Sequence, residues 1–412
     1  MLSLLLAFST SAFAGGFSDF ISGASRWEEP ENIHDIHPDA KRLIIDSLKD
    51  LPGVIDTHLH LICREEKNSC YVPTKLFSTK SHPISTFKTH IFLSALGIRD
   101  EKDTDAQLVQ RIEKLIRNFP SKPYVAMMFA YAASYDADTH KKLLEKTGLE
   151  VPNAYMLEVV KKNPQSLIPV YSLHPFQENL EKEFAKLKNA RFFKILPNSM
   201  NFSPDDEKCS TFFELLAKNE SILITHVGDE HSIEGGGINN AFGNPLLFEK
   251  WLKRFPKLRI IFAHAGGVGK HSFKDVQELM RKYPLQTYAD ISAFSLNAKI
   301  VQYIPELLEA SDLHPRLLYG SDYPVVAIKP MLSATLFAMY WKGLLGNWKE
   351  FNARYNAIIE IYNYNPLLAS VVIMRLVSFK GKQLPPEVFF ENAWRLIGKD
   401  FEFSRTLSGA KL

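Results

Sequence analysis

Short apolar runs alternate with helical patterns along this chain, and this alternation constrains the fold more than any other feature. Eight runs have the length and composition of buried strands, and they begin near residues 54, 124, 167, 191, 222, 258, 285 and 316. Amphipathic helices are predicted between them, for example with apolar faces at residues 108–116 and 247–255. Eight such units predict an α/β fold, a (β/α)8 TIM-type barrel with additional C-terminal helices. An open sheet of six or seven units is the alternative.

The length of 412 residues suits one such barrel carrying insertions. We expect the barrel domain over residues 51–400, with a helical elaboration at residues 330–385. Residues 15–50 are predicted to form an N-terminal extension and residues 401–412 a C-terminal tail. No internal repeat or low-complexity tract suggests a further division of the chain.

Composition narrows the classes of partner. Hydrophobic residues make up 46% and charged residues 23% of the chain, which is ordinary for a globular enzyme. The net charge of +3 is small, and no basic block interleaved with aromatics provides a nucleic-acid footprint. The most apolar helical stretch, residues 367–379, is too short to span a bilayer, so no integral membrane segment is expected. The expected partner is a small-molecule substrate, and a homo-oligomer is left open.

Residues 1–14 have the features of an export signal. An apolar run leads to Ala12-Phe13-Ala14, the small-x-small pattern of a cleavage site, although the segment is short and lacks a basic start. We expect export, to the periplasm, with cleavage after Ala14. A cytoplasmic location is the alternative if the segment is not a signal.

The three cysteines Cys63, Cys70 and Cys209 show no C-x-x-C spacing. Cys63 and Cys70 could bridge a loop, or all three could be free thiols. None of them is expected to take part in chemistry.

The run V-I-D-T-H-L-H, residues 54–60, carries two histidines in a segment patterned for burial. Residues two apart on a strand point to the same side, so His58 and His60 share one face. Two neighbouring imidazoles are costly to bury unless a partner binds their lone pairs, and a divalent cation is one such partner. The alternative is a pair of core histidines bonded to backbone carbonyls or water.

Further polar side chains are predicted at the C-terminal ends of other strands, where a barrel places its active site. In strand order, the candidates are His58 and His60, Lys194, His226, His264 and Asp322. Groups that bind metals or transfer protons, converging from five strand ends on one rim, favour a metal site over core histidines.

The motifs D-T-H-L-H, T-H-V-G, F-A-H-A-G-G and Y-G-S-D-Y-P resemble those of the amidohydrolase superfamily. The likeness is closer to its amidohydrolase-related branch, on F-P-K-L-R-I-I-F-A-H-A-G-G, T-Y-A-D-I-S and the late N-A-x-R-L helix at residues 392–396. It extends over roughly residues 50 to 400 and implies the barrel fold. The branch includes hydrolases, decarboxylases and lactonases, so the motifs say little about substrate.

The resemblance implies a role for each strand-end residue. His58, His60 and His226 would bind a divalent metal, most simply Zn²⁺, and Asp322 would bind metal or the attacking water. His264 would transfer protons or bind a second ion. A cation with an open position lowers the pKa of bound water to about 7, and Asp322 could take up the proton.

Lys194 has three interpretations: a carboxylated lysine that bridges two ions, a substrate contact, or a structural ion pair. The number of ions, one or two, depends on the choice. Weaker candidates for substrate binding lie on loops expected to cover the C-terminal end of the barrel. Each of them could equally be a solvated loop residue. These are Arg64, His174, His231 and Tyr323.

The resemblance implies hydrolysis of an amide, ester or lactone by a metal-activated water. Non-oxidative decarboxylation of a carboxylated small molecule is the alternative, because it uses the same constellation. A catalytically silent, exported binding protein is a third hypothesis, since a fold alone does not establish turnover. The sequence lacks G-x-S-x-G, H-E-x-x-H and G-x-G-x-x-G motifs, which disfavours other catalytic schemes.

Overall fold

The computed structural model describes residues 30, 32–73, 83–98, 101–187, 189–230, 237–267, 269, 272–324 and 329–397. The predicted export signal at residues 1–14, the tail at residues 401–412 and His231 lie outside these residues.

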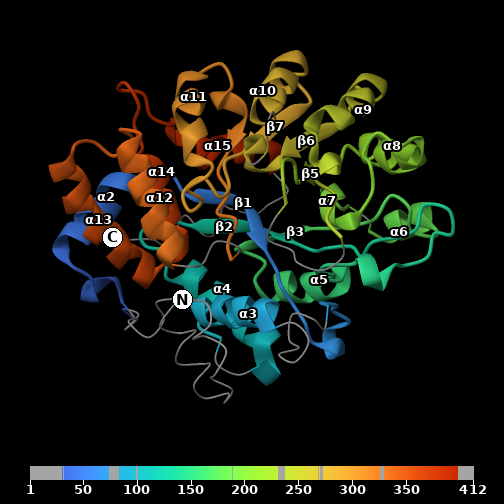
Figure 1. Cartoon of the computed structure of the whole chain (residues 1–412), viewed down its shortest axis with the longest axis horizontal. Helices are drawn as coiled ribbons and strands as arrows, with labels where there is room; N and C mark the ends of the chain where they lie inside the picture. Colours follow the sequence, from blue (N-terminus) through green and yellow to red (C-terminus); the bar gives the residue numbers. More distant parts are fainter. Residues whose placement is uncertain are drawn as a thin grey trace.

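Eight parallel strands form the centre of the molecule (Figure 1). They are β1 (Val54–His60), β2 (Tyr124–Phe129), β3 (Leu167–Val170), β4 (Phe192–Ile195), β5 (Ile222–Thr225), β6 (Arg259–Phe262), β7 (Thr287–Asp290) and β8 (Leu317–Leu318). Each lies within one of the eight predicted runs. Hydrogen-bonded pairs join β1, β2 and β3 in sequence order, and β4 to β8 likewise. Nearly every strand residue is buried, as expected for a parallel sheet covered by helices.

Two seams close these strands into a ring. At the first, Tyr171 after β3 forms a parallel bridge with Phe193 of β4. At the second, Leu59 of β1 bridges Tyr323 beyond β8, and the His60 N–H donates to the Tyr323 carbonyl at 2.8 Å. The fold is therefore a closed (β/α)8 barrel, and the open-sheet alternative is wrong.

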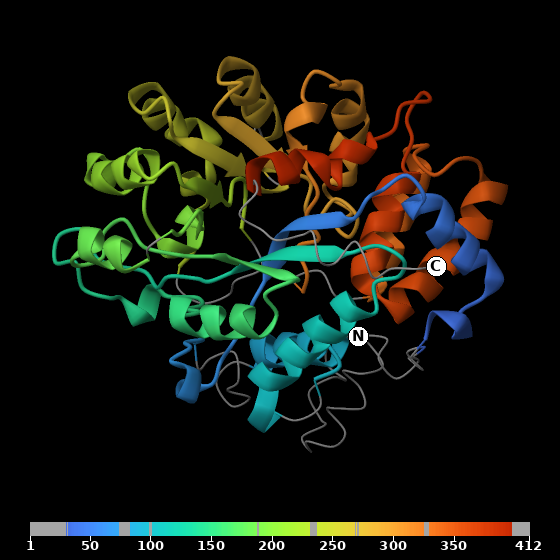
Figure 2. The ribbon, with the colours of Figure 1, turned by 180° about the vertical axis from the view of Figure 1, so that it is seen from behind.

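Helices surround the barrel, as Figures 1 and 2 show from opposite sides. Their apolar stripes face the strands: in α4, for instance, Leu108, Ile112 and Leu115 are buried. The covering helices are α3 (Pro83–Ala95), α4 (Thr104–Arg117), α5 (Asn153–Lys162), α6 (Leu180–Lys186), α7 (Pro197–Met200), α8 (Ser210–Lys218), α9 (Glu249–Arg254), α10 (Ser272–Lys282) and α11 (Ile304–Glu309).

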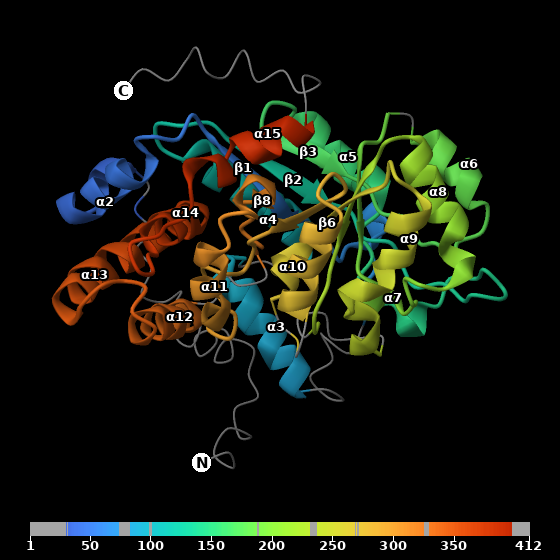
Figure 3. The same cartoon turned by 90° about the horizontal axis from the view of Figure 1, so that it is seen from above.

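Three C-terminal helices, α12 (Lys329–Trp341), α13 (Trp348–Tyr364) and α14 (Pro366–Leu376), form a layer at one side of the barrel (Figure 3). The last helix, α15 (Glu391–Ile397), lies apart from this layer and contacts β1 and β8. The helix α2 (Pro38–Leu48) packs against α13 and α14, so this part of the predicted N-terminal extension belongs to the same core. Arg375 of α14 fastens it by donating to the Ser47 carbonyl and to the Asp50 carboxylate. Among the described residues, no helix has the length and apolarity needed to cross a membrane.

Candidate active site

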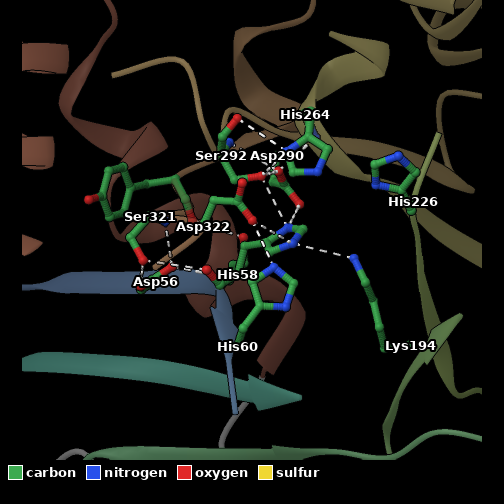
Figure 4. A network of polar contacts seen from close by, with 12 residues as sticks. Asp56, His58, His60, Lys194, His226, His264, Asp290, Ser292, Ser321 and Asp322 are labelled. Carbon is green, nitrogen blue, oxygen red and sulfur yellow. Dashed lines mark hydrogen bonds and ion pairs between the residues drawn. The ribbon is translucent and has the colours of Figure 1, made fainter. Parts of the chain in front are cut away.

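The end of β1 and the segment after β8 bring three buried polar side chains together (Figure 4). The His58 and His60 rings lie 4.9 Å apart, on the shared face that strand alternation predicts. Asp322 Oδ1 lies 2.8 Å from His60 Nε2 and 3.4 Å from His58 Nε2. We call these three residues the ligand group, because one donor atom from each lies within 4.8 Å of the others.

Burial dominates the electrostatics of the ligand group. It raises the pKa of Asp322 to about 7, although the neighbouring His264 and Lys194 oppose this shift. Burial, followed by the charge of Lys194, lowers the pKa of His60 to about 3 and that of His58 well below its ordinary value. Both imidazoles are therefore neutral at pH 7, the form in which histidine binds metals.

A buried carboxylate next to the ligand group holds the second seam together. Asp56 accepts hydrogen bonds from the Ser321 N–H at 2.8 Å, the Ser321 hydroxyl at 2.6 Å and the Tyr124 hydroxyl at 2.7 Å. Burial raises the pKa of Asp56 to about 6. Gly320 permits the close approach of the two strands, because a Cβ there would lie 2.8 Å from the His58 Cβ. The stretch Y-G-S-D thus places Asp322 opposite the two histidines.

Lys194 of β4 reaches the ligand group from the far side of the barrel. Its side chain is buried, with Nζ 3.4 Å from His58 Nε2 and 4.8 Å from the centroid of the Phe129 ring. Burial lowers the pKa of Lys194 to about 8, although nearby carboxylates oppose this shift. This position suits each of the three interpretations of Lys194, so its role stays a prediction.

His264 lies beside His58, with ring centroids 4.9 Å apart, and two residues missed by the sequence analysis link them. Asp290 ends β7 and contacts His58 Nδ1 at 2.9 Å, and Ser292 contacts His264 Nδ1 at 2.8 Å. Burial opposes ionisation of Asp290, but its interactions with His58, followed by His264 and Lys194, outweigh burial and lower the pKa of Asp290. Asp290 terminates the buried run T-Y-A-D, so the rule applied to the other strand ends could have found it.

His226 follows β5 but lies beside His264, with ring centroids 5.2 Å apart, and outside the ligand group. Its Nδ1 is 3.6 Å from Glu230 Oε2, which is too long for a hydrogen bond. Its buried Nε2 has no hydrogen-bond partner among the residues that the structure describes. Burial lowers the pKa of His226 to about 3. Buried polar atoms normally have a partner, so this nitrogen is available to bind a ligand.

The predicted substrate contact of His174 stays a prediction, and the structure shows how the backbone holds its ring. Its side chain is fully buried, Nδ1 accepts the Phe176 N–H at 3.0 Å, and Nε2 donates to the Met200 carbonyl at 2.9 Å. Because the backbone engages both ring nitrogens, His174 supports the loop after β3.

The other loop candidates remain predictions. The Tyr323 carbonyl takes part in the second seam, and its side chain is buried. Arg64 is half-buried after β1, where its backbone N–H donates to Asp105 at 2.8 Å. Neither observation tests substrate binding.

The donor set fits a divalent cation of the zinc type. Two ligands about 2.1 Å from a tetrahedral ion lie roughly 3.4 Å apart, which is the spacing of His58 Nε2 and Asp322 Oδ1. Imidazole nitrogens and a carboxylate oxygen are ligands that zinc accepts. His58, His264 and Asp290 form a second cluster with the same spread, so the donor atoms are compatible with one ion or two.

Comparison with known proteins gives a family. The sequence profile of the amidohydrolase family matches residues 55–338, whereas no curated protein matches the chain. An uncharacterised TIM-barrel protein from Bordetella bronchiseptica aligns at 16% identity and a TM-score of 0.47, over 77% of this chain and 99% of its own. The 4-oxalomesaconate hydratase of Rhodopseudomonas palustris aligns at 12% identity and a TM-score of 0.42, over 87% of this chain and 98% of its own. The 5-carboxyvanillate decarboxylase of Sphingomonas paucimobilis aligns at 14% identity and a TM-score of 0.42, over 69% of this chain and 92% of its own.

The profile match begins in β1 and ends in α12, so it covers most of the barrel and more than half of the chain. The ligand group, Lys194, His226 and His264 all lie inside it. The chain belongs to the amidohydrolase family.

Proposed function

We propose that this protein is a metal-dependent hydrolase of a small-molecule amide, ester or lactone. The observation that carries the proposal is the ligand group, in which two neutral histidines and a carboxylate converge in a family of metal-dependent enzymes. We assign His58, His60 and Asp322 to a divalent cation, most simply Zn²⁺. His226 is a further donor, because its buried Nε2 lacks a partner in the described part of the chain.

The residues around the cation have distinct tasks in this proposal. When bound, the cation supplies Lewis acidity and lowers the pKa of water at the site to about 7. Asp322 lies opposite the two histidines, where its carboxylate can accept a proton from water and return it to a leaving group. His264 holds or protonates a substrate oxygen.

Lys194 gives support to a second candidate function. A decarboxylase needs a cationic group to hold the substrate carboxylate, and Lys194 is a buried amine 3.4 Å from His58. Its pKa of about 8 leaves it mostly protonated at pH 7. Carboxylation of Lys194 would instead favour two ions and hydrolysis. If the protein catalyses neither reaction, the third hypothesis applies, a binding protein without catalytic activity.

The first test is elemental analysis of the purified protein and of His58→Ala, after reconstitution with zinc. We expect about one or two ions per wild-type chain and loss of metal in the variant, since His58 lies in both donor clusters. The control is Ser295→Ala. Ser295 is buried, and its hydroxyl forms a hydrogen bond with the Ser370 hydroxyl, away from the ligand group. Equal metal content in wild type and His58→Ala would remove the ligand group from the proposal.

The second test compares two substrate panels on the metal-loaded protein, with Asp322→Asn as the variant. Esters, amides and lactones are followed by acid release, and carboxylated aromatics by CO₂ release. We expect acid release, reduced at least about 100-fold in Asp322→Asn, because an amide cannot shuttle the proton. CO₂ release alone would establish the decarboxylase, and no turnover on either panel would favour the binding protein.

Export is a separate proposal, for which Cys63 and Cys70 provide support. The two cysteines form a disulfide in the loop after β1, with Cα atoms 5.7 Å apart, and such bonds persist mainly in oxidising compartments. We propose a periplasmic location with cleavage after Ala14. Mass analysis of the mature protein is the test, and an exported chain that keeps Met1 would contradict the cleavage.

A further inference from the structure

A carboxylate and a hydroxyl occupy the space between His58 and His264 (Figure 4). Asp290 Oδ2 lies 2.9 Å from His58 Nδ1, and Oδ1 accepts the backbone N–H groups of His264 at 2.9 Å and Ser292 at 3.1 Å. The Ser292 hydroxyl donates to the same Oδ1, and its oxygen also lies 3.1 Å from His58 Nδ1. Asp290 and Ser292 are both fully buried, so water does not compete for these bonds.

The positions of the protons follow from which atoms can only accept. Three donors surround the Asp290 carboxylate, which favours its ionised form, so His58 Nδ1 must carry the proton that the two share. The Ser292 hydroxyl donates its single proton to Asp290, which leaves its oxygen as an acceptor. His264 Nδ1 faces this oxygen at 2.8 Å and the Ser292 carbonyl at 3.3 Å. Neither has a proton to give, so His264 Nδ1 carries one as well.

We propose that Asp290 and Ser292 are positioning residues that fix His58 and His264 in the same tautomer, with the proton on Nδ1 and the lone pair on Nε2. The inference rests on the proposed function and deepens it. Nε2 of His58 is the atom that faces Asp322 in the ligand group. Nε2 of His264 is then the atom that takes up a proton, which it can afterwards give to a substrate oxygen. One carboxylate thus prepares a metal ligand and a proton-transferring ring together.

A carboxylate suits this position better than an amide. Asp290 takes four hydrogens with two oxygens, on the His58 ring, two backbone N–H groups and the Ser292 hydroxyl. In Asp290→Asn, one of the two acceptors becomes an NH₂ group that faces a donor. Because three donors face Oδ1 and only His58 faces Oδ2, the amide oxygen keeps the Oδ1 position and the NH₂ group faces His58 Nδ1. The His58 ring then loses its acceptor, and its tautomer is released.

The test reads the tautomers in the metal-free protein by ¹⁵N NMR with histidine-selective labelling. Signals of the two rings are identified by their disappearance in His58→Gln and His264→Gln. In the wild type we expect the Nδ1–H form for both rings. Asp290→Asn should release His58, and Ser292→Ala should release His264, toward the Nε2–H form. Ser295→Ala, three residues further along and outside this network, should leave both rings unchanged.

Metal affinity gives an independent readout, measured by zinc competition with a chelator. We expect a loss of about 10- to 100-fold in Asp290→Asn and none in Ser295→Ala. If Asp290→Asn does not fold, Ser292→Ala carries the test through the His264 signal. The proposal is overturned if either wild-type ring has the Nε2–H form, or if the variants leave both tautomers unchanged. Inactivity toward all substrates with the tautomers as expected would overturn the proposed function alone.

Discussion

At the residue scale, the engagement of both nitrogens decides whether a buried histidine can take up a proton. His174 is the clearest case, because it lies outside the site and is held by the backbone alone. A proton added at Nδ1 would face the Phe176 N–H, so two donors would oppose each other. Burial accordingly lowers the pKa of His174 to about 4.

The sign of the resulting pH dependence follows from comparing the folded and unfolded states. The unfolded chain takes up a proton at His174 below a pKa of about 6.5, whereas the folded chain does so only near 4. The stability that neutral His174 contributes is therefore complete above pH 6.5 and is lost as the pH falls toward 4. Between pH 7.5 and 4.5 this loss is roughly 2 to 3 kcal/mol.

Urea unfolding at these two pH values measures the effect. We expect the free energy of unfolding of His174→Gln to fall less with acidification than that of the wild type, since glutamine stays neutral. The exposed His34, replaced in His34→Gln, is the control and should leave the pH dependence unchanged. If the unfolding free energy of His174→Gln fell with acidification as much as that of the wild type, burial would not lower the pKa of His174.

The sequence predicted which residue types meet at the site better than it predicted their contacts. His58, His60 and Asp322 could be placed because parallel strands end at one rim. Asp290 ends a buried run and follows the same rule, although it was not included. Ser292 was missed because a serine after a strand end looks like an ordinary turn residue. The contacts of His174 could not be predicted either, because sequence alone does not reveal that the backbone of Phe176 and Met200 engages both of its ring nitrogens.

At the scale of elements, the loop after β1 is tied to itself by the disulfide between Cys63 and Cys70. The bond closes a short loop with a sequence separation of 7, which restricts the unfolded chain by about 2 to 3 kcal/mol. We expect a reducing agent to lower the urea midpoint of the wild type. The double variant Cys63→Ser/Cys70→Ser should have the lower midpoint under both conditions and should not respond. Cys209 is present in both proteins. If the reducing agent also changed the urea midpoint of the double variant, its effect would not come from the bond between Cys63 and Cys70.

The strands were predictable because their apolar runs must be buried on both sides. Their ends were not, since β8 includes only two residues of the run R-L-L-Y-G-S-D, residues 316–322, before the chain turns to present Asp322. That turn places Asp322 at a φ of 60°, which depends on the contacts of the Ser321 backbone and hydroxyl with Asp56. Such a long-range requirement leaves no local pattern to read.

At the scale of the whole molecule, α2 links the start of the described chain to its C-terminal helices. Ile44 is 2% exposed among α13 and α14, whereas its neighbour Ile45 is 64% exposed. We expect Ile44→Ala to lower the free energy of unfolding by about 2 to 5 kcal/mol, and Ile45→Ala by less than about 0.5 kcal/mol. Equal effects in thermal or urea unfolding would show that α2 does not contribute to the core. The sequence predicted only an extension here, because the pattern of an amphipathic helix does not identify the elements against which it packs.

The second seam has a consequence for how the protein is made. His60 and Asp322 are 262 residues apart in the chain, so a ribosome completes the two histidines long before it adds the carboxylate opposite them. A growing chain, or one cut short before β8, has the histidines without the third donor. Under the proposed role of this site, only a finished and folded chain can capture its cation. The ions present where folding is completed, rather than where synthesis begins, would then decide which metal the enzyme carries.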